Sequence, residues 1–284
     1  MKPRKPPVVV GIDGSDESIA ATEFGVDEAR RRDLPLLVQH CFMWPSLYPP
    51  LLDPDPRDPG PRARAVALLE QTTQTLRGKH PELDIEGRLR DGPAAAMLVE
   101  TSRRAALIVL GHRGSGGFAG LHVGSVAIHT AAHAHCPVAV VRGRPSTPGD
   151  PVVLGVDGSP ESAVARAYAF ETARQRHAPL KVLAVWPSDW APPVQDRPAG
   201  DLIVGYLGDL PDRYPDVVLV PKLLHGESPA GALIAEANDS GLIVVGSRGL
   251  GGLGGILLGS VGRALIAHAP CPVVIVRAPG LSAR

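Results

Sequence analysis

Glycines and a serine occur at a fixed spacing in a segment whose flanks are typical of a ligand-binding loop. In GHRGSGGFAGLHVGS, residues 111 to 125, two residues separate Gly111 from Gly114, and nine more precede the pair Gly124-Ser125. Glycine permits positive φ or a close approach of a ligand to the main chain. The apolar run 107–110 predicts a buried strand before the loop, and Ser125 is a candidate N-cap for a helix after it. This order favours an anion such as phosphate, because free N–H groups and the helix dipole converge there.

The same segment recurs 135 positions later, which indicates an internal duplication. Residues 242–277 align without a gap on residues 107–142, with 20 identities in 36 positions. The second copy repeats the spacing with Gly246, Gly249, Gly259 and Ser260. A flexible linker, the alternative explanation for so many glycines, has no reason to preserve these offsets. The two copies therefore predict two domains, residues 1–145 and 150–284.

An aspartate ends the first apolar run of each copy. VVVGIDGSDES at 8–18 matches VVLGVDGSPES at 152–162, which pairs Asp13 with Asp157. In a parallel sheet, ligands bind outside the carboxyl ends of the strands, so each aspartate is expected to share a crevice with its glycine loop. There it can accept a hydrogen bond from a ribose hydroxyl or an adenine amino group. The alternative is a helix N-cap or turn residue, because Asp-Gly-Ser is also good turn chemistry.

Two better-known phosphate motifs do not account for these loops. Residues 249–254 match a dinucleotide fingerprint, but they follow the fourth strand of their half and lack the expected acid downstream. The lysine of a Walker loop is missing from the sequence. Arg113 and Arg248 are then the nearest cations, either as phosphate ligands or as solvated loop residues.

The hydrophobic pattern predicts strands that alternate with helices. This order implies right-handed crossovers and a parallel sheet with helices on both faces. Strands are expected at 8–13, 35–41, 84–89, 106–111 and 137–142, with helices at 17–32, 62–78, 93–104 and 125–134, and the second half should have strands at 151–157, 179–186, 217–224, 242–246 and 272–277.

Composition excludes several classes of protein. The 29 basic and 29 acidic residues cancel, so no nucleic-acid or anionic membrane surface is indicated. No apolar run approaches the roughly 18 residues of a membrane span, and a cytoplasmic protein is expected. Three cysteines without a CxxC motif predict neither disulfides nor a zinc site.

The repeated motifs resemble those of the universal stress protein family, in its tandem-domain, nucleotide-binding form. The resemblance implies two Rossmann-like α/β domains of the adenine nucleotide alpha hydrolase type, each with five parallel strands in the order 3-2-1-4-5. It also implies ATP, with Mg²⁺, in each domain. The first site would comprise Asp13, Cys41, Gly111, Arg113, Gly114, Gly124, Ser125 and Val126, and the second Asp157, Val185, Gly246, Arg248, Gly249, Gly259, Ser260 and Val261. Cys41 departs from the valine that is usual in the family and that Val185 supplies in the second half.

The same resemblance implies that the last strands of the two domains, Val138 to Val141 and Val273 to Val276, pair within one chain, and a homodimer is a further possibility. A nucleotide-dependent role in stress response or signalling is the leading interpretation. A weak ATP hydrolase and a nucleotide-free interaction scaffold remain as alternatives. No paired carboxylates or activated nucleophile repeat in both halves, which counts against an enzyme.

Overall fold

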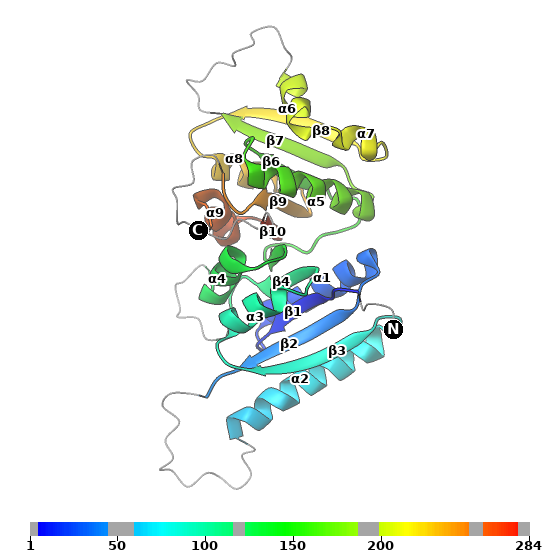
Figure 1. Cartoon of the computed structure of the whole chain (residues 1–284), viewed down its shortest axis with the longest axis vertical. Helices are drawn as coiled ribbons and strands as arrows, with labels where there is room; N and C mark the ends of the chain where they lie inside the picture. The colour runs from blue at the N-terminus through cyan, green and yellow to red at the C-terminus, as the bar shows by residue number, and fades with distance from the viewer. Residues whose placement is uncertain (1–4, 45–59, 116–122, 187–198, 250–257, 278–284) are drawn as a thin grey trace.

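The computed structural model describes residues 5–44, 60–115, 123–186, 199–249 and 258–277, which form two α/β halves (Figure 1). None of the helices in these ranges is long and apolar enough to cross a membrane. The first half comprises β1 (Val8–Ile12), α1 (Asp16–Arg32), β2 (Leu36–Phe42), α2 (Gly60–Lys79), β3 (Ile85–Asp91), α3 (Ala94–Ser102), β4 (Leu107–Gly111), α4 (Ser125–His133) and β5 (Val138–Val141). The second comprises β6 (Val152–Val156), α5 (Pro160–Arg176), β7 (Leu180–Trp186), α6 (Ala199–Leu207), α7 (Leu210–Arg213), β8 (Leu219–His225), α8 (Pro229–Glu236), β9 (Leu242–Gly246), α9 (Ser260–His268) and β10 (Val273–Val276).

The strands form one sheet in the order β3-β2-β1-β4-β5-β10-β9-β6-β7-β8. Within each half all strand pairs are parallel, and the first half has the predicted order 3-2-1-4-5. The order β8-β7-β6-β9-β10 repeats it in the second half. The predicted α/β class is therefore confirmed. The predicted strand 84–89 continues to Asp91, and the strand expected from 217 begins at Leu219.

The two halves meet where β5 and β10 pair in antiparallel orientation near the middle of the molecule (Figure 1). Val140 lies opposite Val273, and Val138 lies opposite Ile275. Every residue of both strands is buried. The contact closes two strand edges that would otherwise expose unpaired N–H and C=O groups.

The central strands β1, β4, β5, β6, β9 and β10 consist of apolar residues and glycine because helices cover both faces of the sheet. Val8 and Val10 point into one apolar cluster with Phe24 of α1, whereas Val9 points into the other with Leu98 of α3. Both clusters continue into the second half. The core therefore crosses the boundary between the halves.

A buried charge cluster joins α1 to α5 on one face of this boundary. Glu28 Oε1 accepts from Arg176 Nη2 at 2.7 Å, and Glu28 Oε2 accepts from Arg32 Nε at 2.9 Å. The guanidinium of Arg32 lies over the ring of Tyr168 at 4.9 Å, and that of Arg176 lies over Phe24 at 5.4 Å. Burial alone would raise the pKa of Glu28, but the surrounding arginines hold it below its ordinary value. The cluster thus depends on charges from both halves.

Candidate functional site

The first candidate site lies at the carboxyl ends of β1 and β4, which are neighbours in the sheet. Asp13 follows β1, and its Oδ2 accepts a hydrogen bond from the backbone N–H of Ser115 at 2.6 Å. Its Oδ1 accepts from the backbone N–H of Ser15 at 3.1 Å and from the Ser15 hydroxyl at 2.6 Å. Asp13 therefore connects the turn after β1 to the glycine loop after β4.

These hydrogen bonds also keep Asp13 ionised. Burial raises the pKa of its carboxyl, but the bonds from Ser15 and Ser115 together outweigh burial and hold the pKa below its ordinary value. An ionised carboxylate has only acceptor atoms. Asp13 is thus suited to groups that donate hydrogen bonds, such as hydroxyls and amines.

Gly114 and Gly249 are required by close approach to these aspartates rather than by positive φ. A Cβ at Gly114 would lie 2.4 Å from Asp13 Oδ2, and one at Gly249 would lie 2.4 Å from Asp157 Oδ2. Neither glycine has a positive φ, whereas Gly14 and Gly158, directly after the aspartates, have φ of 85° and 81°. The side chain of alanine would collide with a carboxylate oxygen at either loop glycine.

Gly111 and Gly246 allow the helices α1 and α5 to pack closely against the ends of β4 and β9. A Cβ at Gly111 would lie 2.8 Å from the main-chain carbon of Glu17 in the first turn of α1, and one at Gly246 would lie 2.9 Å from that of Glu161 in α5. The first turn of each helix can therefore contact the end of β4 or β9 directly.

The loop arginines are paired with glutamates that the sequence interpretation did not include. Arg113 Nη2 lies 3.1 Å from Glu17 Oε1, and Arg248 Nη2 lies 2.7 Å from Glu161 Oε1. The side chain of Arg113 is 51% exposed and that of Arg248 is 23% exposed. The repeated motif Asp-Gly-Ser-x-Glu-Ser contained the signal for both glutamates. Each loop arginine therefore forms an ion pair with a glutamate, which neither the phosphate-ligand nor the solvated-residue interpretation had included.

The helix after each glycine loop begins at the serine itself and not at the residue after it. The prediction of Ser125 as N-cap was wrong, because Gly124 is the N-cap of α4 and Ser125 is its first helical residue. Gly259 and Ser260 have the same positions at α9. Neither glycine N-cap has a side chain to accept from the first-turn N–H groups. Helix N-termini leave such donors without intrahelical partners, and no side chain of the described residues caps them, so they are available to a hydrogen-bond acceptor such as an anion.

The remaining predicted site residues lie on the neighbouring strands β2 and β7 and at the starts of α4 and α9. Cys41 on β2 and Val185 on β7 are half-buried and lie one strand away from β1 and β6, on the side opposite the glycine loops. Burial raises the pKa of the Cys41 thiol. Val126 and Val261 follow the serines at the helix starts and pack against the apolar cluster. The structure thus brings the aspartates and glycine loops together and leaves these four residues at the periphery.

Ser15 offers a test of how far the turn after β1 depends on local hydrogen bonds. Its hydroxyl donates to Asp13 and also accepts from the N–H of Ser18 at 3.2 Å as the N-cap of α1. Ser15→Ala is expected to lower the free energy of unfolding by about 0.5 to 2 kcal/mol, measured by urea denaturation. Ser159→Ala in the second half removes the matching cap bond to Ser162 N–H and serves as the paired variant. Unchanged stability in both variants would contradict this role.

The fold and the repeated site define a tandem α/β protein in which an aspartate and a glycine loop meet twice, at the carboxyl ends of the strands. Residues 6–142 and 149–277 each match the universal stress protein family. The chain therefore belongs to the universal stress protein family.

Relatives of known name cover nearly the whole chain. A universal stress protein from Mycobacterium tuberculosis strain H37Rv is 36% identical, with 97% of this chain and 99% of the relative covered. A second one from that strain is 34% identical, with 96% and 95% covered. The crystal structure of a universal stress protein from Archaeoglobus fulgidus DSM 4304 has a TM-score of 0.73 and 18% identity, with 95% of this chain and 98% of that chain covered. The last similarity shows a shared fold.

Proposed function

We propose that each domain of this protein binds an adenine nucleotide, ATP with Mg²⁺, and that its occupancy controls a role in stress response or signalling in the cytoplasm. One observation carries this proposal: the same constellation is built twice. In each half a loop glycine approaches the aspartate carboxylate so closely that a Cβ would lie 2.4 Å from Oδ2. In each half the loop arginine pairs with a glutamate in the first turn of the helix that follows the aspartate, Glu17 of α1 or Glu161 of α5. In each half a serine also starts the helix after the loop, which has no side-chain cap.

The residues present suit the phosphate end of such a ligand. The first turns of α4 and α9 supply backbone N–H groups, and the hydroxyls of Ser125 and Ser260 lie at the same helix ends. Arg113 and Arg248 add positive charge beside them. Mg²⁺ is commonly held through substrate phosphates, so it would enter with the nucleotide.

The aspartates suit the ribose or adenine end. A carboxylate has about four lone-pair sites, and Asp13 uses three of them for Ser15 and Ser115. It can therefore accept one further bond, or exchange the bond from the loop for one from the ligand. Cys41 and Val185 would then border the base in the first and second site.

Two ATP molecules per chain are the expected result of calorimetric titration with protein verified to be free of nucleotide. Two affinities are expected, because the sites differ at Cys41 and Val185 and because Arg248 is more buried than Arg113. Nucleotide released from freshly purified protein by heating provides an independent readout. Saturation at one equivalent would contradict two working sites, and no heat of binding with either ATP or ADP would contradict the function itself.

A further inference from the structure

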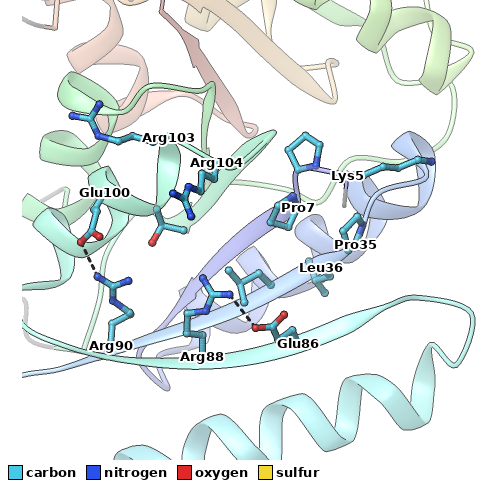
Figure 2. A pocket seen from close by; sticks show the side chains of 13 residues that line it. Lys5, Pro7, Pro35, Leu36, Glu86, Arg88, Arg90, Glu100, Arg103 and Arg104 are labelled. Carbon is cyan, nitrogen blue, oxygen red and sulfur yellow. Dashed lines mark hydrogen bonds and ion pairs between the residues drawn. The ribbon is translucent and has the colours of Figure 1, made fainter. Parts of the chain in front are cut away.

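A groove of about 520 Å³ lies beside the edge strand β3 (Figure 2). Its lining includes Lys5, Pro7, Arg88, Arg90, Arg103 and Arg104. Lys5 and Pro7 precede β1, and Arg103 and Arg104 follow α3, so most of the groove borders the amino ends of the strands. Its volume is in the range of about 300 to 1,000 Å³ that small-molecule sites occupy. We call it the basic groove.

The basic groove has more positive than negative groups. Five of its lining side chains are cationic, and two are carboxylates. Both carboxylates are already paired, Glu86 with Arg88 at 3.0 Å and Glu100 with Arg90 at 2.6 Å, as the dashed lines in Figure 2 show. Among the residues that the structure describes, no carboxylate forms an ion pair with the exposed Arg104. A negative ligand group would find an unused guanidinium there.

An apolar surface adjoins these charges. The rings of Pro7 and Pro35 line the same groove and are half-buried (Figure 2). The stems of the arginines add aliphatic surface, because long cationic side chains keep only their heads in water. The groove therefore suits a ligand that has an apolar part as well as a negative group.

The second half does not repeat this arrangement. Arg90 of β3 pairs with Cys41 of β2 in the sheet register, and the equivalent pair in the second half is Leu224 of β8 with Val185 of β7. Leucine therefore replaces Arg90 in the second half. When the ungapped alignment of residues 107–142 with residues 242–277 is extended toward the N-terminus, Arg104 aligns with Asp239. Because the fold forms in both halves, Arg90 and Arg104 are not required by it. Arg88 corresponds to Lys222, so a cation at that position is common to both halves. The candidate nucleotide sites, which both halves share, do not require Arg90 and Arg104 either.

We propose that the basic groove binds a small organic anion. Its phosphate or carboxylate group would lie between Arg104 on the α3 side and Arg88 on the β3 side, and its apolar part would contact Pro7 and Pro35. This anion site is separate from the proposed nucleotide sites, and each chain would have one such site, in its first half.

The test uses the full chain both with and without saturating Mg²⁺ and ATP, so that uptake of the probes by the nucleotide sites and competition of ATP for the basic groove are each detected. Calorimetric titrations with 1-naphthyl phosphate and with 1-naphthoate distinguish the two anionic groups. One molecule of at least one probe is expected to bind per chain. Arg104→Gln and Arg88→Gln are each expected to weaken that binding about tenfold or more, because each removes a charged hydrogen-bond donor. Arg213→Gln, at an arginine of α7 that is 61% exposed, is the control and should change affinity less than about twofold.

Three results would overturn the proposal. The first is the lack of saturable binding of both probes by the wild-type chain. The second is affinity that neither Arg104→Gln nor Arg88→Gln reduces. The third is binding of inorganic phosphate as tight as that of 1-naphthyl phosphate, which would remove the role of the prolines. The test compares the probe affinities of the wild type and the arginine variants. It therefore decides whether the basic groove binds the probe even if ATP does not bind to the chain.

Discussion

Glu28→Gln is expected to lower the free energy of unfolding by about 3 to 5 kcal/mol, because it leaves buried guanidiniums without their anion. The side chain of Glu28 is 2% exposed and that of Arg176 is 5% exposed. Urea denaturation at pH 7 measures the change. Since the arginines hold the pKa of Glu28 below its ordinary value despite burial, this stabilisation is complete above the pKa of an unfolded glutamate. It is lost as the pH falls through the lower folded pKa, so the variant and the wild type should converge in acid.

A charge exchange tests whether the position of the carboxylate matters. Thr172 has in α5 the place that Glu28 has in α1, four residues before an arginine, and its hydroxyl accepts from Arg32 Nη2 at 3.3 Å. Glu28→Thr combined with Thr172→Glu should therefore recover at least about half of the loss, since a carboxylate again faces both arginines. Asp209→Asn, at a residue 76% exposed, is the control and should change stability by less than about 0.5 kcal/mol. A loss below about 1 kcal/mol in Glu28→Gln would contradict the importance of the cluster.

Gly114→Ala is expected to weaken ATP binding at the first site about tenfold or more and to leave the second site unchanged. The new Cβ would lie 2.4 Å from Asp13 Oδ2, so either the carboxylate or the loop must move. The 2.6 Å bond from Ser115 N–H to Asp13 would then be lost or lengthened. A displaced carboxylate would also lose its hydrogen bond from the ligand, and a hydrogen bond to a charged group is worth about 1.5 to 3 kcal/mol, which corresponds to this change in affinity. Calorimetric titration with ATP resolves the two sites by their stoichiometry.

Two further glycine-to-alanine variants serve as comparisons, one at the second site and one away from both sites. Gly249→Ala creates the same collision with Asp157 and should affect the second site alone. Gly78→Ala in α2 introduces a Cβ with nothing within 4 Å, so ATP binding should not change, and the better helix propensity of alanine should stabilise the fold by up to about 1 kcal/mol. If Gly114→Ala binds two ATP molecules with wild-type affinities, the glycine loop has a structural role only.

The fold class and the twofold architecture follow from the amino-acid sequence alone. Strands that are buried on both faces must be apolar throughout, so runs such as 107–110 and 242–245 are visible without a structure. The repeated spacing of glycine and serine showed that both halves have the same loop. The rule that parallel strands gather their carboxyl ends at one edge was enough to expect Asp13 beside Gly114.

The sequence could not show why the individual residues are needed. Gly114 and Asp13 are about 100 positions apart, and their close contact appears only when β1 and β4 are neighbours. Sequence reasoning allowed positive φ for this glycine, but a steric contact explains it. In the same way, Gly124 rather than Ser125 is the N-cap, because dihedral angles and not residue type decide where a helix begins.

Only the tertiary structure determined which charges meet. Glu28 and Arg176 belong to different halves, and each is an ordinary helical residue by pattern; pairing of β5 with β10 brings α1 and α5 close enough to bury both. Arg104 likewise differs from any surface arginine only by its position beside β3 and Pro7. Hydrophobic periodicity is a local property of the chain and can be read from it. The burial and pairing of charges depend on contacts between distant segments, and therefore on the folded arrangement.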